Sequence, residues 1–146
     1  MKAAQGSTGR VFVVRLEDGD SLPECLERFA SSHGISAALC ILVGGIESGS
    51  IVAGPEDGES RPVEPILLGL DGVHEICGVG TIFSDAEGFP RLHMHATLGR
   101  RQQTVCGCIR PGIDVWQIGE VILLEITGTQ ARRIPDPSTG FEVLQP

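Results

Sequence analysis

The chain of 146 residues is long enough for one domain with one sizeable core, since domains typically contain about 100–150 residues. Its 11 Lys and Arg residues stand against 19 Asp and Glu residues, which gives a net charge of −8. This charge argues against direct DNA binding, because the phosphate backbone requires a positive protein surface. Apolar residues make up 41% of the chain, but no apolar run approaches the ~20 residues of a membrane-spanning helix. We therefore predict a single domain over residues 1–146 and no membrane partner.

The amino terminus and the cysteines both bear on the cellular compartment. Residues Met1–Arg10 carry one lysine followed by polar residues, without the apolar stretch of a signal peptide, so a cytoplasmic location is expected. The five cysteines are an odd number at irregular spacing. In a chain without a secretion signal, this favours free thiols or metal ligands over a disulfide framework.

The first predicted elements are a strand over Val11–Leu16, which is β-branched and apolar, and a helix directly after it. Ser21 stands three residues before Glu24, which is the spacing of a capping box and predicts the start of the helix. Apolar residues then follow with helical periodicity, at Leu22, Cys25, Leu26, Phe29 and Ala30. Gly34 is expected to end the helix, with His33 capping its carboxyl end.

After Ser36 the helical period disappears, and β-rich apolar runs alternate with glycine turns. The runs are AALCILVGGI, SIVAG, VEPILLGLDG, EICGVGTIFS, RLHMHATLG, TVCGCI and VWQIGEVILLEITG. Several are apolar throughout, which indicates burial on both faces. We predict an α+β fold in two layers, a mainly antiparallel β-sheet packed with one principal α-helix. Neighbouring subunits are expected to cover the other face of the sheet.

Two histidines and two cysteines form the candidate metal site. His93 and His95 stand at i and i+2, so on a strand both imidazoles point to the same face. A hairpin between this strand and the run Thr104–Ile109 would bring the Cys108 thiolate beside them, with Cys106 on the same face. The set is His93, His95 and Cys108, or these three with Cys106 as a fourth ligand. It suits a borderline-soft divalent ion, with Zn²⁺ as the first expectation.

Two other interpretations of these residues stay open. The histidines can be ordinary residues on a polar strand face, and free cysteine is often simply buried. Cys106 and Cys108 can instead form a redox pair. Two carboxylates, Glu120 and Glu125, are candidates for a general base. Their spacing places them on opposite faces of a regular strand, so at most one can face the metal.

Several phrases together resemble the plant-and-prokaryote conserved (PPC) domain, in its stand-alone prokaryotic form without an AT-hook. They are GRVFVVRLEDGDSL, FASSHGISAALCILVGGIESGSIV, PRLHMHATLG, CGCIRPG and GEVILLEITG. The resemblance covers about residues 9–137 and leaves 138–146 as a turn-rich tail. It implies a compact α+β domain that assembles as a homotrimer.

The same resemblance implies a metal, commonly bound in this family by a His-x-His strand and a Gly-Gly-His turn. His93 and His95 match the strand, and Cys106-Gly107-Cys108 takes the place of the turn, so a thiolate would replace the third imidazole. The fold is also similar to a domain of the zinc enzyme acetolactate decarboxylase, for which Arg91 would join the glutamates as a candidate catalytic residue.

Two functions are therefore considered. The first is a metal-binding oligomeric domain that acts by binding a small ligand or a protein partner. The second is a metalloenzyme acting on a small carbonyl or carboxylate substrate, which requires an open metal position with a carboxylate nearby. A site closed by Cys106 as a fourth ligand would be structural.

Overall fold

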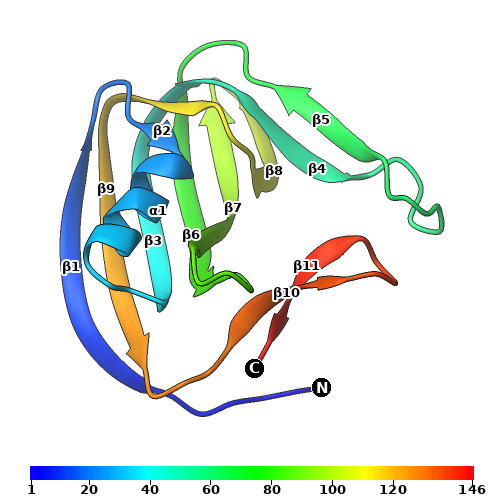
Figure 1. The fold of residues 1–146 in the computed structure, drawn as a ribbon. Helices are drawn as coiled ribbons and strands as arrows, with labels where there is room; N and C mark the ends of the chain where they lie inside the picture. The colour runs from blue at the N-terminus through cyan, green and yellow to red at the C-terminus, as the bar shows by residue number, and fades with distance from the viewer.

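The computed structural model describes residues 1–146 and contains one helix and eleven strands (Figure 1). In chain order they are β1 (Ser7–Glu17), β2 (Ser21–Leu22), α1 (Glu24–Ser32), β3 (Ala37–Ser48), β4 (Ser50–Pro55), β5 (Pro65–Gly69), β6 (His74–Ser84), β7 (Pro90–Arg100), β8 (Gln103–Ile109), β9 (Ile113–Thr127), β10 (Arg132–Asp136) and β11 (Phe141–Gln145). The seven runs predicted after Ser36 correspond to β3 through β9, and the strand predicted at Val11–Leu16 lies within β1.

Nine strands form one antiparallel sheet, in the order β1-β9-β3-β6-β7-β8-β4-β5, with β2 paired to β9. The sheet curves around α1, which lies against its concave side (Figure 1). We call the face that carries α1 the inner face and the opposite one the outer face. The α+β class and the packing of one helix on an antiparallel sheet are as predicted. The structure contains no helix with the length and apolar character of a membrane-spanning segment.

The hydrophobic core lies on the inner face, between the sheet and α1. The helix contributes Leu26 and Ala30, which are fully buried, and Leu22 at the end of β2 packs into the same cluster. The strands contribute residues spaced by two, because alternate side chains of a strand point to one face. Cys40, Leu42, Met94, Ala96, Val121 and Leu123 are examples. The apolar stripe predicted for the helix is therefore buried as expected.

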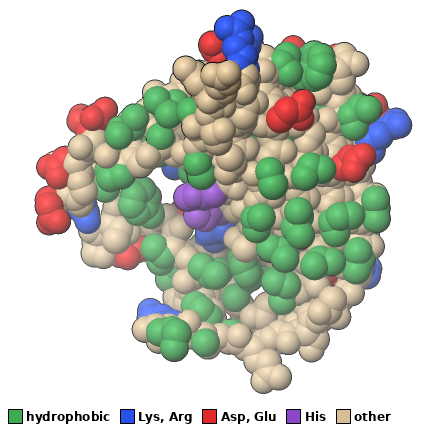
Figure 2. Space-filling model, turned by 180° about the vertical axis from the view of Figure 1, so that it is seen from behind, with side chains coloured by type: hydrophobic (Ala, Val, Ile, Leu, Met, Phe, Trp, Pro, Cys, Tyr) green, Lys and Arg blue, Asp and Glu red, His purple; other side chains and the backbone are tan.

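The outer face exposes apolar side chains over four adjacent strands, β1, β9, β3 and β6. We call this surface the apolar outer face; it consists of Val11, Val13, Ile41, Val43, Val79, Ile118 and Ile122, each between 37% and 83% exposed. One row crosses it by direct pairing, from Val13 through Ile122 and Ile41 to Val79. Val79 pairs in turn with His95, so the surface ends at the candidate metal site. Figure 2 shows these apolar side chains beside the histidines.

The capping box predicted at Ser21 and Glu24 is wrong. Ser21 belongs to β2 and donates its hydroxyl to Asp114 Oδ1 across the pair, at 2.7 Å. The helix begins after Pro23, without a side-chain cap. Its carboxyl end is as predicted, since His33 occupies the C-cap and its Nδ1 lies 2.9 Å from the carbonyl oxygen of Phe29.

The carboxyl-terminal segment is more ordered than its turn-rich composition suggests. β10 and β11 form a separate two-stranded sheet, with Ile134 opposite Val143. The chain reverses at Gly140, whose φ of +75° lies in the region that glycine adopts without strain. The residues predicted as a tail, 138–146, thus include strand β11, and the hairpin places β10 near β6 of the main sheet.

Candidate metal centre

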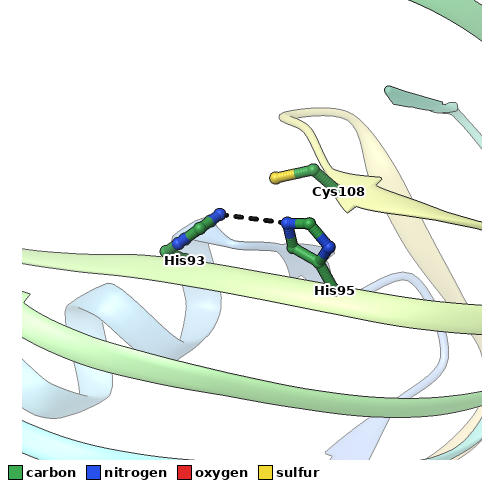
Figure 3. A group of neighbouring side chains, drawn as sticks. All are labelled: His93, His95 and Cys108. Carbon is green, nitrogen blue, oxygen red and sulfur yellow. Dashed lines mark hydrogen bonds between the residues drawn. The ribbon is translucent and has the colours of Figure 1, made fainter. Parts of the chain in front are cut away.

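Three side chains that can bind a metal meet on the outer face. His93 and His95 project from β7, and Cys108 projects from β8 directly opposite His95 (Figure 3). The Nε2 atoms of the two imidazoles are 3.2 Å apart, and one ligand atom from each of the three residues lies within 4.8 Å of the others. The hairpin that the spacing predicted is present, and the structure brings these three candidate ligands together.

The arrangement fits a tetrahedral ion. Two imidazole nitrogens bound to one Zn²⁺ are about 3.3 Å apart, given bonds of 2.0–2.1 Å and a tetrahedral angle. The separation of 3.2 Å between the two Nε2 atoms is close to that value. Without an ion this contact is a hydrogen bond, in which one ring donates and the other accepts. Two nitrogens and one sulfur match the ligand preference of a borderline-soft divalent metal and leave a fourth position free.

The surroundings of His93 favour its neutral, ligating form. Partial burial of the imidazole ring lowers the pKa of His93, and the nearby charges of Arg133, His95 and Arg110 lower it further. A metal ligand has to be the unprotonated imidazole, so these groups reduce the competition between protons and a metal. Two of them are arginines, which makes the surroundings of the site electropositive although the whole chain is acidic.

The Cys-Gly-Cys sequence, expected in place of a turn, lies within strand β8 and brings only one of its two thiols to the site. Cys108 is buried, whereas Cys106 is exposed, lies opposite Thr97 and is not among the three grouped ligands. Gly107 stands between them because β4 passes closely here. A Cβ at this position would lie 2.6 Å from the carbonyl oxygen of Val52. The glycine therefore lets β8 approach β4 and hold Cys108 facing His95.

The remaining candidate residues lie away from the three ligands. Glu120 is on the outer face of β9, three strands from β7, which corresponds to about 14 Å. Arg91 is on β7, but its guanidinium pairs with Asp85 at 2.9 Å and with Glu27 of α1 at 3.9 Å. The structure therefore brings neither residue to the candidate metal centre.

Glu125 has a structural partner on the other side of the sheet. Its carboxylate accepts hydrogen bonds from Arg10 Nε and Nη2, both at 2.7 Å, and from the Arg10 backbone N–H at 3.0 Å. Arg10 Nη2 also donates to the carbonyl oxygen of His33 at the end of α1. The hydrogen bonds from Arg10 hold the pKa of Glu125 at about 2, below its usual 4.5. The pair joins β1, β9 and the helix.

This ion pair predicts a dependence of stability on pH. Because the pKa is lowered in the folded state, the stabilisation is complete above about pH 4.5 and is lost as the pH falls through about 2. Glu125→Gln should lower the free energy of unfolding by about 1–2 kcal/mol at pH 7. This is less than the full pKa shift of Glu125 implies, because the half-exposed Arg10 is screened by water.

Urea unfolding at pH 7 and pH 2.5 measures this loss of stability. The difference from wild type should shrink at the lower pH, while Glu120→Gln, at an exposed site on the same strand, should match wild type at both. An equal loss at both pH values would contradict this role of the ion pair.

Two further cysteines, Cys25 and Cys40, belong to the hydrophobic core and not to the candidate metal centre. Cys40 is fully buried in β3, and Cys25 packs against the core from α1. Burial raises the pKa of the Cys25 thiol to about 11 and that of the Cys40 thiol to about 12. Both therefore stay protonated at neutral pH, and Cys108 is the thiol placed to ligate.

One residue beside the site had no signal in the sequence. Arg133 of β10 is buried, and its Nη2 donates to Thr81 Oγ1 at 3.1 Å. Thr81 pairs with His93 across β6 and β7, so the guanidinium lies next to the candidate ligands. In the sequence, Arg132-Arg133 looks like an ordinary pair of solvent-exposed arginines near a chain end. Only the folding back of the β10–β11 hairpin buries Arg133 and leaves Arg132 exposed.

Two solved structures share this fold over the whole chain. The metal-containing protein of Archaeoglobus fulgidus is 27% identical, with a TM-score of 0.87 and 100% of both chains covered. A plant- and prokaryote-conserved protein of Pyrococcus horikoshii is 22% identical, with a TM-score of 0.85, and covers 100% of this chain and 98% of its own. The second likeness shows the fold alone.

Among curated proteins, the bifunctional protein GlmU of a Synechococcus strain is 27% identical over 135 residues, which are 90% of this chain. The chain spans about a fifth of that relative's length, 19%, so the similarity concerns one segment of a longer protein. The family model of the Plants and Prokaryotes Conserved (PCC) domain matches residues 3–127. This match covers most of the chain, including β1 to β9, α1 and the three candidate ligands. The chain therefore belongs to the plant-and-prokaryote conserved domain family.

Proposed function

We propose that this protein is a metal-binding module that holds one Zn²⁺ per chain through His93, His95 and Cys108. The observation that carries the proposal is the grouping of the three ligand atoms within 4.8 Å on adjacent strands. The Archaeoglobus fulgidus relative, described as a metal-containing protein, supports it. Zn²⁺ fits because it accepts nitrogen and sulfur ligands together in tetrahedral geometry. When bound, the ion would act as a Lewis acid with a free position for an oxygen ligand.

We also propose that the module assembles as a homotrimer in the cytoplasm. The support is the apolar outer face, because exposed apolar surface of this extent marks an interaction site on a soluble protein. The helix covers only the inner face of the sheet. In a homo-oligomer, a neighbouring copy of the chain would cover the apolar outer face. The net charge of −8 favours a small ligand or a protein as the further partner over DNA.

Binding is preferred over catalysis because of the positions of the carboxylates. Three protein ligands leave a metal position free, which an enzyme would require. However, Glu125 is paired with Arg10 on the inner face, and Glu120 lies three strands away on the outer face. Neither carboxylate stands where it could move a proton at the metal. The metalloenzyme acting on a small carbonyl or carboxylate compound is the second candidate.

Elemental analysis of protein purified without chelator under reducing conditions tests the proposal, with the mass determined by light scattering in the same run. One zinc per chain in a particle of three chains is the expected result. Protein that contains no metal and takes up no added Zn²⁺ would contradict the metal site. A particle of one chain would contradict the homotrimer and leave the metal site standing.

The sulfur ligand makes a separate spectroscopic prediction. Co²⁺ substituted for Zn²⁺ should show a charge-transfer absorption from the Cys108 thiolate in addition to its tetrahedral bands. Cys108→Ala should remove the charge-transfer band, whereas Cys106→Ala, two residues away on the same strand, should retain it. If Cys106→Ala loses the band and Cys108→Ala keeps it, the sulfur ligand is Cys106 and the proposed ligand set is wrong.

A further inference from the structure

Arg133 is a buried cation that no carboxylate contacts at ion-pair distance. The residue is 6% exposed, and it takes part in none of the ion pairs of the structure. Its Nη2 donates to Thr81, and its Nε is buried with no acceptor at all. A buried charge normally has an opposite charge or a full set of hydrogen bonds, because removal from water is otherwise unfavourable. The guanidinium therefore has unused capacity for an anion.

The position of Arg133 connects that capacity to the candidate metal centre. Thr81, which accepts from Arg133, is the direct cross-strand neighbour of His93. The guanidinium is close enough to His93 and Cys108 for its charge to act on both, and Glu142 of β11 attracts it from beyond ion-pair distance. Arg110, two residues after Cys108, adds a second positive charge at His93. Figure 2 shows a basic side chain in the recess next to the histidines.

The geometry of the guanidinium group indicates which class of anion Arg133 would bind. Its planar fork of N–H donors matches the two oxygens of a carboxylate. A metal held by two neutral imidazoles and one thiolate keeps a position for an oxygen atom. We propose that Arg133 binds the carboxylate of a small organic acid whose oxygen also occupies the free position of the metal. This inference rests on the proposed function, because the metal supplies the second anchor.

The test titrates Zn²⁺-loaded wild-type protein with pyruvate by calorimetry, beside pyruvamide, its uncharged analogue, and inorganic phosphate. Arg133→Gln should weaken pyruvate binding about 10–100-fold, the usual effect of losing a hydrogen bond to a charged group. Arg133→Lys should recover part of this loss, because it keeps the charge without the fork. Arg132→Gln, at the exposed neighbouring position of β10, is the matched control and should bind pyruvate as wild type does.

Zinc content and thermal unfolding are measured on each variant, so that loss of the ligand is separated from loss of the metal or the fold. Arg133→Gln that keeps one zinc per chain and loses pyruvate affinity supports the inference. Unchanged pyruvate affinity in that variant would overturn it, and so would binding of pyruvamide or phosphate in preference to pyruvate. Zinc-loaded wild type that binds no pyruvate would overturn the inference alone. Wild type that binds no zinc would overturn the proposed function together with it.

Discussion

Replacing His93 by alanine is expected to abolish stoichiometric Zn²⁺ binding while the sheet and helix remain folded. The imidazole is one of three ligands, and its Nε2 lies 3.2 Å from that of His95, where a shared ion would sit. Loss of a partner outside the ligand set typically weakens metal affinity 10–100-fold, so loss of a ligand itself should cost at least about 100-fold. The side chain is exposed on the outer face, so its removal leaves no cavity in the core.

Metal content by elemental analysis, Zn²⁺ affinity by competition with a chelating dye and far-UV circular dichroism together check this result. His33→Ala is the matched control, because His33 is an exposed histidine at the end of α1. It should retain the metal of wild type. A His93→Ala protein that still carries one zinc per chain would show that the ion is held elsewhere.

Introducing charge into the apolar outer face is expected to reduce the proposed homotrimer to single chains. The double variant Val13→Lys, Ile41→Lys changes two members of that surface, on β1 and β3, which are 83% and 40% exposed. In an assembled trimer each lysine would be buried without a partner, at a cost repeated in every interface. In the separated subunit the same side chains would be solvated, since exposed substitutions usually change stability by about 0.5 kcal/mol or less.

Light scattering over a range of protein concentrations measures this change. Leu67→Lys on β5 is the control, because Leu67 is 62% exposed but lies outside the apolar outer face. It should keep the mass of wild type. If the double variant remains a trimer, another surface forms the interface. Zinc content should be retained, since neither position contributes a ligand.

Local patterns in the chain were sufficient to predict most of the sheet and the three candidate ligands. Strand alternation alone puts His93 and His95 on one face, and the short connection between β7 and β8 brings Cys108 opposite His95. The same alternation puts Glu120 and Glu125 on opposite faces of β9, as the structure has them. These features depend on residues that are close together in the sequence, so the local sequence pattern is enough to predict them.

The incorrect or missing expectations all involve partners far apart in the chain. Ser21 has the spacing of a helix cap, but its hydroxyl binds Asp114 because β2 pairs with β9. Glu125 could be a free carboxylate until β1 places Arg10 beside it. A capping or charge motif indicates which hydrogen bonds or ion pairs a side chain is able to form. Pairing between strands that are distant in the chain decides which of these interactions it makes.

By itself the sequence determined the antiparallel α+β fold, the family and the triad of His93, His95 and Cys108. Periodicity and short hairpins specify these features through contacts between nearby residues. Only the tertiary structure decided that the outer face leaves Val13 and Ile41 exposed and that Arg133 lies buried beside His93. Neither result follows from a local pattern, because each depends on which distant segments cover a given face of the sheet.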